Sequence, residues 1–152
     1  MRFLTIILLA AFALANAKSV SITVQQDSAM TALQKAIDAK TKALYGDRDF
    51  RKAARYEVQD QLDYLDHLLK YKVKDTAAVL TFASERSELL DLEKQQLEHI
   101  LDTQDDNNRY MIRQHIRATQ RQMAAVADYI TRLSSDNGTN VIHHEKQSLN
   151  LE

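Results

Sequence analysis

The sequence contains no cysteine, no proline and only two glycines in 152 residues. Average usage would give roughly 8 prolines and 10 glycines in a chain of this length. The lack of cysteine excludes a disulfide framework, cysteine-based zinc sites and a cysteine nucleophile. The shortage of glycine and proline argues against turn-rich β-sandwiches, collagen-like chains and glycine-rich phosphate loops. With 45% hydrophobic and 27% charged residues, the composition is typical of one globular domain.

Residues 1–17 have the organisation of a secretory signal peptide. A short cationic start is followed by an apolar run over residues 3–14 and by Ala-Asn-Ala, a small-residue cleavage pattern, at 15–17. The run of about 12 residues is too short to span a bilayer, which needs about 20. We therefore expect cleavage after Ala17 and a secreted, extracellular chain with no integral membrane segment. The alternative is a buried N-terminal helix, which would have no polar face.

The charge balance and one short motif bear on partners and modification. A formal net charge of −1 argues against nucleic acid, whose recognition usually needs a strongly basic surface. Asn137, followed by Gly138 and Thr139, forms a sequon and is a candidate glycosylation site. Such a three-residue motif also arises by chance.

The remaining chain divides by its hydrophobic pattern. Residues 18–27 alternate apolar and polar side chains, which predicts an extended N-terminal arm lying across helices, because no partner strand is evident. Residues 28–134 show helical spacings of three and four, and residues 135–152 are polar enough to predict a flexible C-terminal tail.

Four amphipathic helices account for residues 28–134. The first begins at Asp27 or Ser28 and ends before Gly46, the second runs from about residue 50 to 73, and the third follows Asp75. The fourth begins at a cap within 103–106 and buries one apolar face, which includes Ile112, Ile116, Met123, Val126, Ala127, Ile130 and Leu133. Short connections favour antiparallel neighbours, so we expect an all-α, up-down-up-down four-helix bundle.

The boundary at residues 70–75 is the weakest, because no glycine or proline enforces a break there. If the second and third helices fuse into one rod, partner chains must complete the core as in a coiled coil. Self-association through coiled-coil packing is therefore an open alternative.

No catalytic, metal or cofactor constellation is present in the sequence. No Glu has His three residues later, so the di-iron bundle motif is missing, and neither a G-x-S-x-G elbow nor an H-E-x-x-H motif occurs. His115 borders an apolar face, which most often indicates a packed side chain rather than a metal ligand. The His143-His144 pair lies in the predicted tail and defines no geometry. We expect a protein that is not an enzyme and that uses no cofactor.

The sharpest charge pattern is a row of arginines spaced by four: Arg109, Arg113, Arg117 and Arg121. The planar guanidinium fork suits a sulfated or phosphorylated partner. The alternative is intramolecular, because in an antiparallel hairpin Asp102, Glu98 and Asp91 would lie level with Arg109, Arg113 and Arg121. We favour this alternative, in which each surface pair contributes about 0 to 1 kcal/mol.

Two charges interrupt the apolar stripe of the third helix. Arg86 and Glu93 fall seven residues apart among Val79, Phe82, Leu89 and Leu97. Either both lay their stems on the core edge with their heads in water, or they face polar partners and fix register or oligomeric state.

Tyr64 and Tyr71 form a second stripe beside the main apolar face of the second helix. Core packing explains such a stripe more often than contact with a ligand or a partner. Taken together, the sequence predicts a secreted, non-enzymatic helical bundle that binds a protein partner or its own copies. The alternative is an extracellular carrier of lipid or another small apolar ligand.

Overall fold

The computed structural model describes the backbone of residues 3–9, 19–25 and 27–149, and the side chains of residues 27–136. In these segments five helices pack against one another, and two strands form an antiparallel pair. In chain order the elements are β1 (Phe3–Leu9), β2 (Ser19–Gln25), α1 (Ser28–Leu44), α2 (Arg48–Ala53), α3 (Val58–Lys70), α4 (Thr76–Leu101) and α5 (Asp106–Leu149). The predicted helical class is confirmed.

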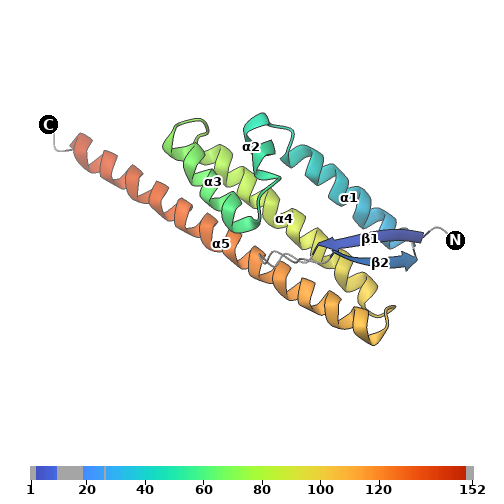
Figure 1. Ribbon diagram of the computed structural model, residues 1–152. Helices are drawn as coiled ribbons and strands as arrows, with labels where there is room; N and C mark the ends of the chain where they lie inside the picture. Colours follow the sequence, from blue (N-terminus) through green and yellow to red (C-terminus); the bar gives the residue numbers. More distant parts are fainter. Residues whose placement is uncertain (1–2, 10–18, 26, 150–152) are drawn as a thin grey trace.

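Helix α4 lies at the centre of the helical part, with α1 packed on one side and α5 on the other (Figure 1). Lys40 of α1 pairs with Glu88, while Asp27 at the start of α1 contacts His99, so α1 and α4 run antiparallel. Helix α3 packs on α5 and on the N-terminal part of α4, and it also runs antiparallel to α4. Helices α1 and α3 therefore run in the same direction along successive stretches of α4, which differs from the expected strict up-down alternation.

The difference arises at residues 54–57, where the predicted second helix is divided into α2 and α3. Three backbone hydrogen bonds close this turn, each from an N–H to the carbonyl three residues earlier. One of them runs from the N–H of Tyr56 to the carbonyl of Ala53. The Gln61 side chain also donates to the Ala53 carbonyl, over 2.7 Å. These bonds satisfy backbone groups that a continuous helix would otherwise pair, so the chain breaks here without glycine or proline.

The weak boundary at 70–75 is a defined break between α3 and α4, as the four-helix interpretation expected, and the alternative of one fused rod is not what the structure has. The N–H of Val73 bonds to the Leu68 carbonyl and that of Lys72 to the Leu69 carbonyl, which is a Schellman motif. Lys72 has φ 54°, the left-handed conformation that glycine usually supplies at this position. The Asp75 side chain then accepts from the backbone N–H of Ala78 and caps α4 as expected.

The core has a large cluster and a smaller one. The large cluster joins α1, α2, α3, α4 and α5, and Phe50 stacks on Phe82 within it at 4.5 Å between ring centroids. The small cluster lies towards the α4–α5 turn and consists of Met30, Leu97, Ile100 and Ile112. In α5 the expected face is correct for Ile112 and Val126, whereas Ile116 and Met123 are half-buried and Ala127 is exposed. Tyr129 and Thr119 are buried instead.

The extended segment near the N-terminus has a partner, contrary to the expectation of an unpaired arm. Strand β2 pairs antiparallel with β1, with Phe3 opposite Gln25 and Leu9 opposite Ser19. The apolar run of β1 suits a strand as well as the core of a leader. Since β1 lies wholly within the predicted signal peptide, cleavage after Ala17 would remove it and leave β2 without this pairing.

Helix α5 remains helical to Leu149, past residue 134, where the sequence predicted the helix to end. The residues that follow Leu133 are weak helix formers, but each polar one costs at most about 0.7 kcal/mol, Gly138 costs about 1 kcal/mol, and none is proline. Across the described helices, none is long and apolar enough to cross a membrane.

Candidate functional site

The most prominent surface feature is a row of four rings along the outer side of α3 and the turn before it. Tyr56 lies 5.8 Å from Tyr64, Tyr64 lies 6.1 Å from His67, and His67 lies 4.5 Å from Tyr71, measured between ring centroids. We call these four residues the aromatic row. Its two ends are open to solvent, because Tyr56 is 44% and Tyr71 59% exposed.

The row is built partly by helical spacing and partly by the chain break. Residues 64, 67 and 71 are three and four apart, so they share one side of α3. Tyr56 joins them only because the turn at 54–57 brings it back beside Tyr64. Leu68, which lies between Tyr64 and Tyr71 in sequence, is buried. Tyr64 is half-buried, and this burial raises the pKa of its hydroxyl. The row is thus anchored at its centre and exposed at its ends.

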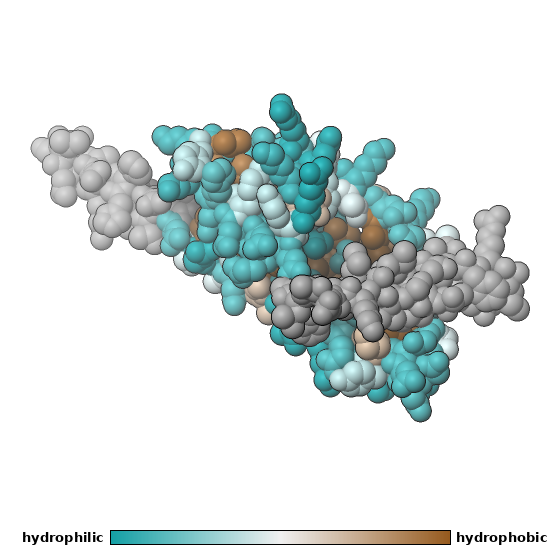
Figure 2. All heavy atoms as spheres, in the orientation of Figure 1, coloured by the Kyte–Doolittle hydropathy of each residue, from teal (hydrophilic) through white to brown (hydrophobic). Residues whose placement is uncertain are grey.

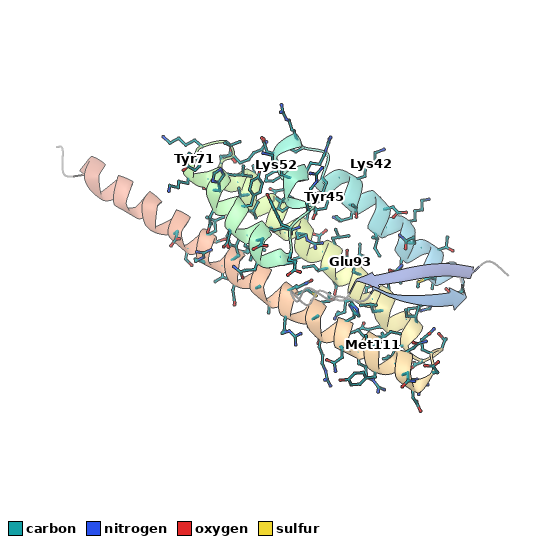
Figure 3. The ribbon with its side chains drawn as sticks, viewed as in Figure 1. Lys42, Tyr45, Lys52, Tyr71, Glu93 and Met111 are labelled. Carbon is teal, nitrogen blue, oxygen red and sulfur yellow. The ribbon has the colours of Figure 1, made fainter. Side chains whose placement is uncertain are left out.

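The segment after Tyr71 is fixed to α2 by Lys74. The Lys74 ammonium pairs with Asp47 at 2.6 Å and with Asp49 at 3.5 Å, and it lies 5.3 Å from the centre of the Phe50 ring. The hydrogen bond from Lys74 lowers the pKa of Asp47. Figure 3 labels Tyr71 at the end of α3 beside this turn. Tyr71 and the half-exposed Val73 are therefore presented on a tied turn.

The two charged residues in the apolar stripe of α4, Arg86 and Glu93, belong to a polar network that connects several helices. Arg86 donates from Nε to Oε1 of Gln61 at 3.1 Å, and its side chain is only 15% exposed. Gln61 in turn donates to the Ala53 carbonyl and, at 3.3 Å, to the hydroxyl of Tyr45. The partner of Arg86 is thus another helix of the same chain.

Glu93 lies at the edge of this network, on α4 (Figure 3). Its carboxylate is 3.9 Å from the Arg86 guanidinium, and its side chain is 40% exposed. Loss of solvent raises the pKa of Glu93, and the positive charge of Arg86 partly offsets this effect. Glu93 therefore has water on one side and Arg86 on the other.

The sequence predicted that acids of α4 would pair with the arginine row on α5. Within the described residues, the structure does not show this pairing for Arg113, Arg117 or Arg121. Arg109 reaches the backbone carbonyl of Asp102 and lies 3.8 Å from Asp106, while Arg113, Arg117 and Arg121 are exposed. Two of the three acids that were expected to pair with the row have other partners. Asp91 accepts from Gln95 and, like Glu98, pairs with Lys94 on α4 itself.

A groove of about 530 Å³ lies over α4 between α1 and α5. Its lining is mixed: Lys40, Ser84, Ser87, Glu88 and Asp91 are polar, and Leu92, Met123 and Ile130 are apolar. Lys40 and Glu88 form an ion pair at its rim. More of the exposed lining is apolar than polar, as in most small-molecule sites, but charged and hydroxyl side chains interrupt it.

The described histidines show no metal site. His99 contacts Asp27 at 2.8 Å, His67 is part of the aromatic row, and His115 has a buried Nε2 with no hydrogen-bond partner among the described residues. Burial lowers the pKa of His115. Within residues whose side chains are described, no three His, Asp or Glu side chains are grouped to hold a metal ion. His143, His144 and the side chain of Asn137 lie outside these residues.

Comparison with known proteins finds no relative: no family model, curated protein or solved structure matches the chain. The function must therefore be argued from the surface of this molecule.

Proposed function

We propose that the protein is a secreted, non-enzymatic helical protein that acts by binding a protein partner or its own copies through the aromatic row. The observation that carries the proposal is the continuous contact of Tyr56, Tyr64, His67 and Tyr71 with exposed rings at both ends. Tyrosine is enriched at protein interfaces because its ring buries a large apolar area while its hydroxyl still hydrogen-bonds.

The surroundings of the row also support a protein partner. Lys70 lies 5.6 Å from the centre of the Tyr71 ring, and exposed Lys72 and half-exposed Val73 follow on the same tied turn. An apolar centre bordered by charged side chains is the usual anatomy of an interface. The turn is held by Lys74 and by the Schellman motif, so little conformational entropy would be lost on binding.

The alternative, a carrier of lipid or another small apolar ligand, has less support. The face in Figure 2 is mainly hydrophilic, with hydrophobic colour in small separate areas. The groove between α1 and α5 is lined by charged and hydroxyl side chains as well as apolar ones. An apolar ligand would displace water from these polar groups, which costs free energy.

The test is sedimentation of the purified protein over a wide concentration range, compared with the double variant Tyr56→Ser, Tyr71→Ser. Tyr110→Ser is the matched control, because Tyr110 is 61% exposed but stands outside the row. Self-association that is lost in the double variant and kept in the control supports the proposal in its self-binding form. Association that both variants lose equally, or a shift on adding phosphatidylcholine vesicles, contradicts it and favours non-specific contact or the lipid carrier.

A further inference from the structure

Helix α5 carries a second surface, on a different element from the aromatic row. From residue 107 to residue 127 it contains four arginines, one histidine and no aspartate or glutamate. Arg113, Arg117 and Arg121 are exposed, and none of them makes an ion pair or hydrogen bond with its side chain within the described part of the chain. We call these three residues the arginine ridge.

Helix geometry explains why the ridge escapes the acids of α4. Ile112, Thr119 and Val126 are buried at intervals of seven and mark the core side of α5. A spacing of four advances about 40° round the helix per step, so an arginine row that starts near the core rotates away from it. Arg109, at the start of the row, is half-buried and bonds to the Asp102 carbonyl, whereas Arg121 lies almost opposite the core.

The ridge is a single file of guanidinium groups. Neighbouring α-carbons are about 6 Å apart along the axis, and the ridge covers about 12 Å. Each guanidinium presents a planar fork of donors that matches the oxygens of sulfate or phosphate. Three unpaired forks in file, with no acid on this stretch of α5, complement a linear polyanion rather than a single small anion. Glu57, in the turn before α3, lines a hollow together with Arg121 at one end of the ridge.

The side chains beside the arginine ridge indicate which class of anionic partner fits it. The residues that flank the ridge along α5 are Gln114, Ala118, Gln120 and Ala124, which are polar or small, and the exposed ring of Tyr110 precedes it by about one turn. A protein interface needs an apolar centre, and a membrane-bound helix needs large apolar side chains beside its bases. One exposed tyrosine supplies neither an apolar centre nor a row of large apolar side chains. A hydrated chain of anionic groups needs only charge and hydrogen bonds.

We infer that the arginine ridge is a binding site for a linear sulfated polysaccharide. The choice of a polysaccharide over other polyanions rests on the proposed extracellular location. The ability of the ridge to bind a polyanion does not depend on that location. Sulfate esters stay ionised at all physiological pH values and present the oxygen geometry that guanidinium accepts in pairs. The site would hold the protein at a surface rich in such chains and leave the aromatic row on α3 free for its own partner.

The experiment measures binding of the purified protein to heparin at low salt by titration calorimetry. The ridge variant Arg113→Gln, Arg117→Gln, Arg121→Gln is compared with the control Arg48→Gln, Lys52→Gln, Arg55→Gln. The control removes the same charge from exposed side chains on α2 and in the turn after it, none of which makes an ion pair within the described residues. Circular dichroism confirms that both variants are folded.

The site predicts at least a tenfold loss of heparin affinity in the ridge variant and less than a threefold loss in the control. Because binding to a polyanion releases counterions, the salt dependence should also become shallower in the ridge variant. Hyaluronan, a linear polysaccharide with carboxylates and no sulfate, should bind at least tenfold more weakly than heparin.

Three results would overturn the inference: equal losses in both triple variants, no binding of heparin at low salt, or equal or tighter binding of polyglutamate or phosphatidylserine vesicles. The last would indicate an acidic protein segment or a membrane surface instead. None of these results bears on the tyrosine variants, so failure here is distinguishable from failure of the proposed function.

Discussion

Arg86 of α4 donates from Nε to Oε1 of Gln61 of α3, over 3.1 Å, and Gln61 is only 2% exposed. This bond places a positive charge inside the apolar stripe of α4 without leaving it unpartnered. Through Gln61 it also reaches the carbonyl of Ala53 and the hydroxyl of Tyr45, so it joins α4 to α3, to the end of α2 and to the end of α1. The network fixes how the two halves of the divided helix sit on α4.

Replacing Arg86 by Leu should destabilise the protein by about 1–3 kcal/mol, because Oε1 of the buried Gln61 then has no donor. Urea unfolding followed by circular dichroism measures this. Arg113→Leu, an exposed position on α5, is the control and should change the free energy of unfolding by less than about 0.5 kcal/mol. Equal effects at the two positions would mean that the Gln61 bond has no structural role.

Lys72→Gly should stabilise the protein by about 0.5–1 kcal/mol. Lys72 has φ 54°, which costs an L-residue about 1–2 kcal/mol, and glycine adopts this conformation without a steric penalty, although it loses more entropy on folding. Lys70→Gly, at the last residue of α3, should instead destabilise it. A midpoint of thermal unfolding that falls in both variants would be inconsistent with the Schellman turn.

Stability should decline on acidification as Asp47 is protonated. Its hydrogen bond with Lys74 lowers the pKa in the folded state, so the stabilisation is complete above the ordinary aspartate pKa of about 4 and is lost as pH falls through the lower folded value. Asp47→Asn keeps a capping side chain for α2 but removes the charge, so the melting temperature should fall less on acidification below about pH 5 than in the unchanged protein. Asp27, whose pKa is also lowered, keeps part of the decline. An unchanged acid profile in this variant would show that the Lys74 contact does not form in solution.

Processing should begin the secreted chain at Lys18, because residues 15 and 17 are the small residues before the predicted cleavage site. Intact-mass measurement of material from the medium checks this. Cleavage would also remove β1, and so the pairing seen for β2. A secreted chain that retains residues 3–9 would exclude the signal peptide and keep the strand pair as part of the fold.

The helix starts could be predicted because they depend on local chemistry. Asp27 and Asp75 cap α1 and α4 through side-chain bonds to Met30 and Ala78, and Asp105 accepts from Asn108 at the start of α5. The break between α2 and α3 could not be predicted, since it depends on the side chain of Gln61, which binds the carbonyl of Ala53 eight residues earlier. The period of three and four continued through it without a visible signal.

The surfaces were only partly predictable for the same reason. Tyr64 and Tyr71 are on one side of α3 by spacing alone, but Tyr56 reaches them through the break. The arginines are evident in the sequence, yet their exposure depends on where the core side of α5 lies. Thr119 and Tyr129, which help to mark that side, are polar or amphipathic, and the hydrophobic pattern did not include them.

The central claim is that the aromatic row meets another protein, and photo-crosslinking tests it most directly. A photoreactive benzoyl-phenylalanine is placed at position 71 or, as the control, at position 110. The substituted protein is expressed in the cells that naturally produce it. The account predicts one discrete crosslinked species from position 71, either a partner or a second copy, that is absent from position 110 and disappears when Tyr56→Ser is added. Equal crosslinking from both positions, or a species at 71 that Tyr56→Ser leaves unchanged, would contradict it.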